Sequence, residues 1–231
     1  YCRYILKFLV PATTSRGTYT EKETYFLKLE DEEVPGAFGI GECAVFRGLS
    51  CDDVPEYEDK LRELCRNISN DCDTDLRNFP SIVFGLETAI YDYSNGCRRL
   101  PFPSDFTKGN DVIPINGLVW MGTKDEMISR IDEKIKAGFT TIKLKVGAID
   151  TDSELDLVKH IRKVFPPEAL TIRLDANGGF HKDEALSILE KFSKYGIHSI
   201  EQPIKSGHWE DMAEICRNSP IPIALDEELI G

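Results

Sequence analysis

The stretch FTTIKLKVG, residues 139–147, decides the fold of this chain. β-Branched and apolar residues alternate in it around Lys143 and Lys145, a pattern typical of a β-strand. Side chains two residues apart in a strand lie on the same face, so the two ammonium groups should project side by side into one environment. A solvent-exposed strand face could carry such a pair at little cost, and the neighbouring sequence decides between that interpretation and a functional one.

The register of this stretch recurs along the second half of the chain. AGFTTIK at 137–143 and YGIHSIE at 195–201 each place a charged residue five positions after a glycine that should end a helix. Strand-like and helix-like segments alternate, and the five predicted strands are VIPINGLVW (112–120), FTTIKLKVG (139–147), LTIRLDANG (170–178), IHSIEQPI (197–204) and PIALDEEL (222–229). Capping boxes, Thr123 to Glu126 and Thr151 to Glu154, should begin two of the helices. This alternation predicts a parallel sheet, either doubly wound or closed into a barrel.

The motifs favour the barrel. A dinucleotide-binding doubly wound domain should open a helix with GxGxxG after its first strand, and GIGEC at 39–43 resembles only the beginning of that motif. In a barrel, catalytic residues collect at the carboxyl ends of several strands, as the polar residues do in this sequence. We therefore predict an α/β fold, a (β/α) TIM-type barrel, over residues 111–231. Residues 1–110 mix strand-like runs with helix-like segments at about 54–68 and 81–95, which predicts an α+β domain ahead of it.

Composition excludes several classes of function. With 28 Lys and Arg against 40 Asp and Glu, the formal charge is −12, which disfavours nucleic acid as a partner. The longest uncharged segment, Val112 to Thr123, has twelve residues, fewer than the roughly 18 that suggest a membrane span. The N-terminal run YCRYILKFLV is broken by Arg3 and Lys7 and lacks a cleavage pattern, so we expect a cytoplasmic protein. The seven cysteines follow no zinc-site spacing and are expected to be free thiols.

Carboxylates stand at the ends of three successive predicted strands. Asp175, Glu201 and Asp226 lie 26 and 25 residues apart, one βα unit each, so a barrel would bring them to one mouth. Three anions that close require a cation, and oxygen ligands alone suit Mg²⁺ or Mn²⁺ better than zinc. Each acid alone could be a helix cap or a surface salt bridge, but three of them beside a lysine pair favour a metal site. Asn177 shares a face with Asp175, although Asn before two glycines is also typical of a turn.

The motifs KLK, LDANG, IEQP and ALDE, in this order and spacing, resemble the enolase superfamily in its muconate-lactonizing-enzyme-like branch. The resemblance covers the whole chain and implies an α+β capping domain at 1–110 and the first five strands of the (β/α) barrel at 111–231. GIGECAVFRGLS at 39–50 and NFPSIVFGLETAIYD at 78–92 most resemble the bacterial o-succinylbenzoate synthase family.

The resemblance implies a metal-dependent lyase that removes the proton α to a substrate carboxylate and stabilises the resulting enediolate. It makes Lys145 the base and Lys143 a source of positive charge, with Asp175, Glu201 and Asp226 as ligands of Mg²⁺ or Mn²⁺. The implied reaction is dehydration of 2-succinyl-6-hydroxy-2,4-cyclohexadiene-1-carboxylate to o-succinylbenzoate in menaquinone biosynthesis. The pKa of the base should lie below the ~10.4 of free lysine, because a second ammonium group, the metal and burial all disfavour its charged form.

The substrate is less well defined by the motifs than the proton abstraction is. Dipeptide epimerases and N-acylamino-acid racemases of the same superfamily share these lysines and acids, and all act on small-molecule carboxylates. Arg16, in PATTSRGTYTEK at 11–22, could bind a substrate carboxylate, and a solvated turn residue is its alternative. A Schiff-base aldolase could use one lysine but would not require three metal-spaced acids. A non-catalytic barrel protein is the remaining alternative.

The sequence departs from the superfamily in the number of strands. A complete barrel needs eight strands, and this chain stops at Gly231 after the fifth, so we expect it to be part of a longer protein. The lysine that relatives carry on the sixth strand lies outside it. The open sheet edge should favour association, including formation of a homo-oligomer.

Overall fold

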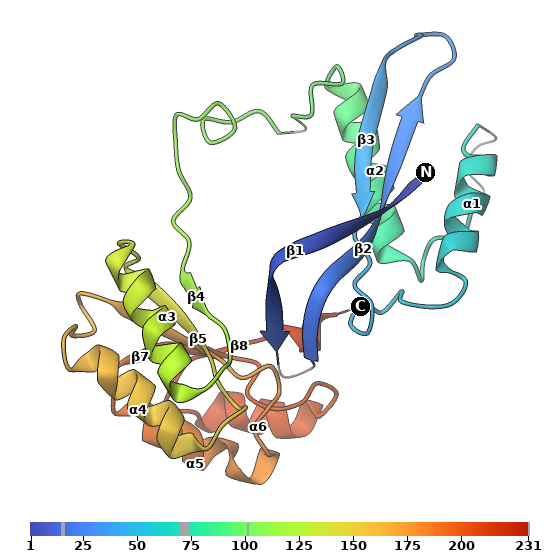
Figure 1. Cartoon of the computed structure of the whole chain (residues 1–231). Coiled ribbons are helices and arrows are strands. Elements are labelled where there is room, and N and C mark those ends of the chain that lie inside the picture. The colour runs from blue at the N-terminus through green and yellow to red at the C-terminus, as the bar shows by residue number, and fades with distance from the viewer. Residues whose placement is uncertain (15–16, 70–73, 101, 231) are drawn as a thin grey trace. The chain divides into compact units, whose positions relative to one another are not determined.

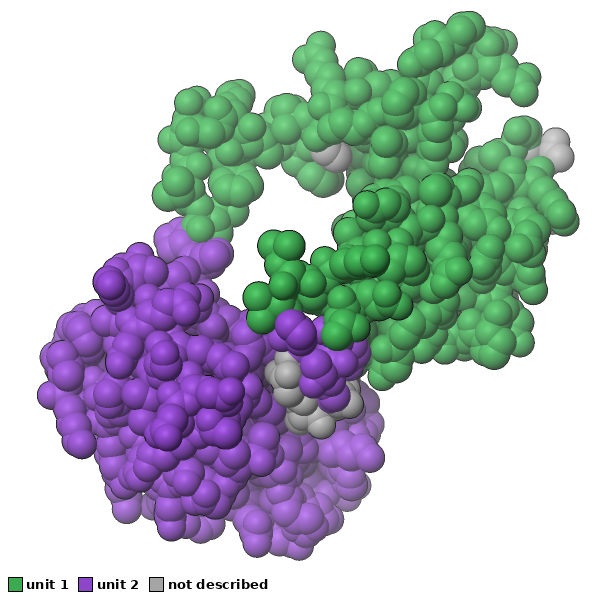
Figure 2. Space-filling model, viewed as in Figure 1, with its two compact units in different colours: residues 1–10, 20–113, 231 green, residues 11–19, 114–230 purple. Residues whose placement is uncertain are grey.

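The computed structural model describes residues 1–14, 17–69, 74–100 and 102–230. The chain divides into two compact units, one of residues 1–10 and 20–113 and one of residues 11–19 and 114–230 (Figure 2). Each unit has its own hydrophobic core, with Tyr25 and Leu61 buried in the first and Ile142 and Leu174 in the second. No helix of the described residues is long and apolar enough to cross a membrane.

The N-terminal half of the chain combines a small antiparallel sheet with two helices. The sheet has the order β1-β2-β3, and the elements are β1 (Cys2–Thr14), β2 (Gly17–Glu30), β3 (Phe38–Cys43), α1 (Tyr57–Asn67) and α2 (Pro80–Ser94). β2 and β3 are antiparallel, with Tyr25 opposite Cys43. Both predicted helices form, so this part of the chain has the α+β character that the sequence indicates.

The glycines of GIGEC allow a helix to lie directly on a strand. A Cβ atom on Gly41 would stand 1.7 Å from the carbonyl oxygen of Gly85 in α2, and one on Gly39 would stand 2.0 Å from that of Ala89. No side chain fits in that space, so the backbones of α2 and β3 are in contact. These glycines therefore serve helix packing on the sheet, in agreement with the absence of a complete dinucleotide-binding motif.

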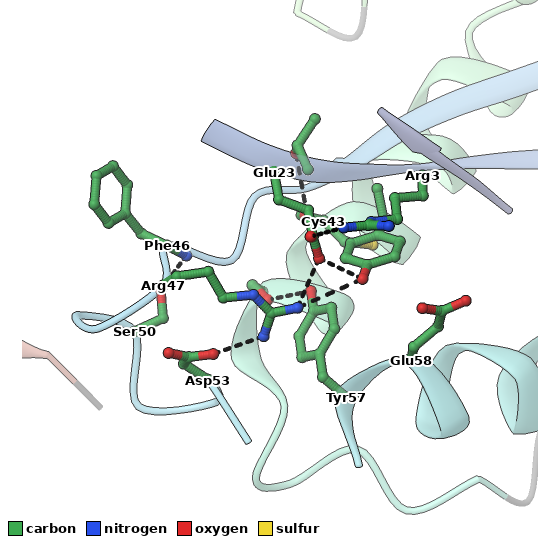
Figure 3. A network of polar contacts seen from close by, with 12 residues as sticks. Arg3, Glu23, Cys43, Phe46, Arg47, Ser50, Asp53, Tyr57 and Glu58 are labelled. Atoms are coloured by element: carbon green, nitrogen blue, oxygen red, sulfur yellow. Dashed lines mark hydrogen bonds and ion pairs between the residues drawn. The ribbon is translucent and has the colours of Figure 1, made fainter. Parts of the chain in front are cut away.

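The loop after β3 is held by a network of ion pairs (Figure 3). Arg47 donates to Asp53 at 2.6 Å and to Glu23 at 2.7 Å, and Arg3 lies 2.5 Å from the other oxygen of Glu23. The hydroxyl of Tyr25 donates to the same carboxylate at 2.5 Å. Burial opposes ionisation of Glu23, but the hydrogen bonds from Tyr25, Arg47 and Arg3 prevail and lower its pKa to about 2.

The second unit is a five-stranded parallel sheet with the order β4-β5-β6-β7-β8. Its elements are β4 (Gly117–Val119), α3 (Lys124–Lys136), β5 (Thr141–Lys145), α4 (Thr151–Arg162), β6 (Thr171–Asp175), α5 (Lys182–Ser193), β7 (Ile197–Glu201), α6 (Trp209–Asn218), β8 (Ile223–Ala224) and the 3₁₀ turn η1 (Glu227–Leu229). Each strand lies beside the one before it, and helices α3 to α6 contact one another in turn (Figure 1). This winding is that of a barrel, because a doubly wound sheet reverses its strand order.

The alternation of side chains along the strands separates the core from the polar face. Ile142 and Leu144 of β5 and Leu174 of β6 are fully buried in the core that they share with the helices. Because neighbouring residues of a strand point to opposite faces, Lys143 and Lys145 lie on the face of the sheet that points away from that core. The sequence pattern around the lysine pair therefore reflects one apolar and one charged face.

The predicted helix ends are confirmed at α3. The hydroxyl of Thr123 accepts a hydrogen bond from the backbone of Glu126, whose carboxylate accepts one from the backbone of Thr123 at 2.8 Å. Gly138 and Gly196, which follow α3 and α5, have φ angles of +87° and +61°, as glycines that end helices should.

The second predicted capping box is wrong. Helix α4 is capped by Asp150, whose carboxylate accepts from the backbone N–H of Ser153 at 2.9 Å. Glu154 instead reaches back to the loop after β5 and accepts from the backbone of Gly147 at 2.6 Å and of Ala148 at 3.2 Å. Aspartate immediately before Thr151 is the stronger N-cap, which leaves the glutamate available to fix that loop.

Candidate active site

The charged residues predicted to share a site lie on adjacent strand ends. β5, β6 and β7 end at Lys145, Asp175 and Glu201. The sheet register places Lys145 beside Asp175 and Asp175 beside Glu201. Parallel strands with matched ends thus bring side chains from positions 30 and 26 residues apart to one edge of the sheet.

The two lysines and two of the acids form a continuous ion-pair network. Lys143 Nζ lies 2.9 Å from Asp175 Oδ2 and 2.7 Å from Glu201 Oε2. Lys145 Nζ lies 2.5 Å from the same Asp175 Oδ2. Asp175 is fully buried, so its charge depends on these two ammonium groups. Because both lysines are paired with this buried acid, the alternative interpretation of the pair as part of a solvent-exposed strand face is wrong.

The pKa values follow from burial and from this pairing. Burial raises the pKa of Asp175, but the nearby ammonium groups of Lys145 and Lys143 outweigh it and lower the pKa below its usual range. Burial raises the pKa of Glu201, and Asp175 adds to the effect against the opposing influence of Lys143. Burial lowers the pKa of Lys143, yet its bonds to Glu201 and Asp175 raise it overall. Attraction to the acids therefore dominates over repulsion between the lysines at Lys143.

Asn177 also belongs to this network. Lys145 Nζ donates to Asn177 Oδ1 at 2.7 Å, and Asn177 Nδ2 donates to Glu227 Oε1 at 3.2 Å. The backbone of Asn177 is left-handed, with φ of 45°, which is the turn conformation that its position before two glycines indicates. The residue is therefore both a turn residue and a neighbour of Lys145. Arg16 lies outside the described residues.

Asp226 lies beyond the end of β8, and the charges of the neighbouring acids and lysines affect its pKa. Burial raises its pKa, Glu227 and Asp175 raise it further, and Lys143 and Lys145 oppose them. Within residues 1–14, 17–69, 74–100 and 102–230, no three His, Cys, Asp or Glu side chains surround one point as metal ligands.

The donor set nevertheless fits a hard divalent cation. All three acids offer only carboxylate oxygens, which Mg²⁺ prefers. The ammonium group of Lys143 lies between two of them, so a positive charge already stands where Asp175 and Glu201 converge. Lys143 and Lys145 supply the counter-charges of Asp175 and Glu201 in this arrangement.

Two further residues of this region escape prediction from the sequence. Gln202 and Glu228 are buried polar residues that hydrogen-bond to each other at 3.1 Å beside the segment that carries Asp226. Gln202 stands in the IEQP motif, and each of the two residues lies within two positions of a predicted ligand, but neither fact indicates that they hydrogen-bond to each other.

Comparison with known proteins agrees with this fold. Residues 126–231 match the family described as enolase C-terminal domain-like. The chain is 39% identical over 265 residues to an o-succinylbenzoate synthase of Desulfotalea psychrophila, an alignment that covers 100% of this chain and 71% of that protein. It is 25% identical to an o-succinylbenzoate synthase of Thermosynechococcus vestitus, over 96% of this chain and 65% of that protein.

Solved structures give the same result. The crystal structure of MenC from Desulfotalea psychrophila matches with a TM-score of 0.76 at 35% identity, over 99% of this chain and 71% of that one. The o-succinylbenzoate synthase of Thermosynechococcus elongatus, complexed with Mg in the active site, matches with a TM-score of 0.77 at 25% identity, over 98% and 67%.

A barrel-type sheet whose strand ends carry paired lysines and carboxylates, together with these matches, defines the class: the chain belongs to the enolase superfamily. Within that superfamily it is similar to the bacterial o-succinylbenzoate synthases. The predicted fold class and family resemblance are thereby confirmed.

Proposed function

We propose that this protein dehydrates 2-succinyl-6-hydroxy-2,4-cyclohexadiene-1-carboxylate to o-succinylbenzoate, a carbon–oxygen lyase reaction of menaquinone biosynthesis. The observation that carries the proposal is the ion-pair network of Lys143, Lys145, Asp175 and Glu201 at three adjacent strand ends. Its occurrence in a chain 39% identical to an o-succinylbenzoate synthase supports this substrate.

Lys145 is the base in this proposal. Asp175 and Asn177 hold its Nζ by hydrogen bonds of 2.5 and 2.7 Å, which fixes the direction from which it approaches a substrate. The neutral amine takes the proton from the carbon α to the carboxylate, and the electrons of the broken C–H bond enter the carboxylate as an enediolate. The C–O bond to the β-hydroxyl then breaks, the new C=C bond makes the ring aromatic, and Lys145 returns its proton to the departing oxygen to give water.

Charge stabilisation is the other requirement of this reaction. Asp175, Glu201 and Asp226 would hold Mg²⁺, or Mn²⁺, and when bound the ion supplies positive charge that stabilises the enediolate. Lys143 adds a second positive charge on the same face of the sheet. Asn177 is the proposed substrate-binding residue, supported by its hydrogen bond to the base.

Epimerisation of dipeptides is the second candidate, favoured by relatives such as the L-Ala-D/L-Glu epimerase of Francisella tularensis, 34% identical over 146 residues, 62% of this chain and 40% of that protein. Epimerisation returns a proton to the opposite face of the same carbon and therefore needs a base on each side of the substrate. The elimination proposed above uses one base on one face. The lysine pair of β5 accounts for that elimination without a second base.

An absorbance assay of the full-length protein tests the proposal. With the cyclohexadiene substrate and Mg²⁺ we expect the diene absorbance to disappear. In a separate measurement with L-Ala-L-Glu, we expect exchange of the α proton with solvent to be slower than this dehydration. Lys145→Ala should slow dehydration by about 10²–10⁴-fold. Lys159→Ala, which removes a partly exposed lysine of α4 paired with Asp156, should leave the rate unchanged. Efficient dipeptide epimerisation with negligible dehydration would reject the lyase assignment.

A further inference from the structure

Asp226 has little support from the sheet. β8 consists of only two residues, Ile223–Ala224, so Asp226 lies two residues beyond the last strand position. Its φ and ψ angles of −129° and −81° are those of no regular element. The position of this carboxylate must therefore be set by contacts outside the sheet ladder.

Gln202 provides those contacts. Its Oε1 accepts from the backbone N–H groups of Asp226 at 3.2 Å and of Glu228 at 3.3 Å. Its Nε2 donates to the carbonyl oxygen of Ile204 at 3.0 Å and to the Glu228 carboxylate at 3.1 Å. The side chain is fully buried, and both lone pairs and both hydrogens of its amide are used. An amide so completely satisfied has one low-energy orientation and fixes what it binds.

Glu228 extends this support to a second loop. Its other oxygen, Oε1, accepts from the backbone N–H of Gly207 at 2.8 Å, and the side chain is buried. The backbone of Gln202 donates to Ala224 at 2.9 Å and accepts from Gly178 at 2.7 Å. The loops that follow β6, β7 and β8 thus all hydrogen-bond to Gln202 or to its partner.

The backbone of Gln202 is strained to make this arrangement. Its φ of +39° lies in the left-handed region, which a residue with a side chain adopts only where the surroundings enforce it. A glycine would adopt that conformation more readily but could not supply the amide. The strain is therefore consistent with a role for the side chain.

We propose that Gln202, acting with Glu228, is a positioning residue that holds Asp226 where it can complete a divalent-cation site with Asp175 and Glu201. The inference rests on the proposed function, since it takes these three acids to be ligands. Gln202 itself touches neither substrate nor cation. Removing its amide should free the segment of Asp226 and weaken cation binding before any chemistry takes place.

Calorimetric titration of the full-length protein with Mg²⁺, without substrate, tests this role. Gln202→Met keeps the length of the side chain but removes all four hydrogen bonds, and we expect Mg²⁺ affinity to fall about 10- to 100-fold, as for loss of other residues that orient metal ligands. The matched control is Arg162→Met. Arg162 is hydrogen-bonded to four carbonyl oxygens, including those of Leu170 and Gly196. These two residues precede β6 and β7, at the strand ends that lie away from Asp175 and Glu201. This control should lose stability but keep its Mg²⁺ affinity.

A charge exchange keeps the test decisive if Gln202→Met fails to fold. Gln202→Glu alone places two carboxylates against each other and should weaken Mg²⁺ binding. Adding Glu228→Gln restores a donor facing an acceptor between positions 202 and 228, while the carbonyl of Ile204 stays without its donor, so the double variant should recover part of the lost affinity. Unchanged affinity in folded Gln202→Met or in folded Gln202→Glu, or equal loss in Arg162→Met, would overturn the positioning role. If Glu201→Gln also leaves wild-type Mg²⁺ affinity intact, the proposed metal site itself fails.

Discussion

Lys145 and Asp175 lie opposite each other on the neighbouring parallel strands β5 and β6, with Nζ and Oδ2 2.5 Å apart. The lysine proposed as the base and an acid proposed as a metal ligand are therefore direct partners. Activity and metal binding should respond differently when one or the other is changed, and this difference makes their roles separable by mutation.

Glu201→Gln should reduce Mg²⁺ affinity more than about 100-fold, beyond the usual cost of losing a residue that only orients a ligand. The change removes a negative charge and a carboxylate oxygen while preserving shape, so the fold should persist. Calorimetry measures the affinity and circular dichroism the fold. Glu214→Gln, an exposed acid of α6, is the control. Tight Mg²⁺ binding by a folded Glu201→Gln protein would contradict the assignment.

Lys145→Ala should lower the rate of dehydration by about 10²–10⁴-fold, the usual contribution of a general base. Lys143→Ala should also slow the reaction, because it removes positive charge that stabilises the enediolate. Rates under saturating Mg²⁺ test both variants. Borohydride added with substrate distinguishes a further mechanism, since a covalent adduct on either lysine would indicate Schiff-base chemistry in place of proton abstraction.

Glu154 should make stability depend on pH near neutrality. Its burial outweighs the hydrogen bonds from Gly147, Ile149 and Ala148 and raises the pKa to about 7 from an ordinary 4.5. The folded state therefore binds this proton more tightly than the unfolded state, and stability should fall as pH rises from about 4.5 to about 7. The shift corresponds to about 3 kcal/mol at most.

Glu154→Gln should remove most of that slope, because the amide cannot ionise. Denaturant unfolding between pH 5 and pH 8 measures it, with Glu190→Gln, an exposed acid of α5, as the control. A slope that persists in Glu154→Gln would assign the dependence to another group.

Glu23 should stabilise the first unit in the opposite pH direction. Its pKa is lowered from 4.5 to about 2, so its contribution is present above pH 4.5 and is lost as pH falls through 2. Glu23→Gln should cost about 1 kcal/mol at pH 7, a value reduced for the solvent that reaches Arg3 and Arg47. Urea unfolding at pH 7 and pH 3 measures the loss, which should be smaller at pH 3. Glu32→Gln, in an exposed turn, should change neither value.

The strand ends were predictable because alternation, glycine positions and spacing are local properties of the sequence. A residue that ends one parallel strand must lie near the residue that ends the next. The proximity of Lys145, Asp175 and Glu201 therefore follows from their spacing of one βα unit each. The pairing of lysines with acids does not follow, because it depends on side-chain reach across strands. The roles of Glu154 and Gln202 were also hidden, since hydrogen bonds to backbone groups of another loop leave no periodic signal.

The network of Lys143, Lys145, Asp175 and Glu201 contains two positive and two negative charges. A structural zinc site leaves the protein unfolded when the metal is removed, because its ligands have no other partners. At these strand ends the ammonium groups of Lys143 and Lys145 already balance the carboxylates. The sheet can therefore form first and bind a cation afterwards. If the proposed Mg²⁺ site is correct, magnesium starvation would leave an inactive but intact protein that recovers when the ion returns, with no need for new synthesis.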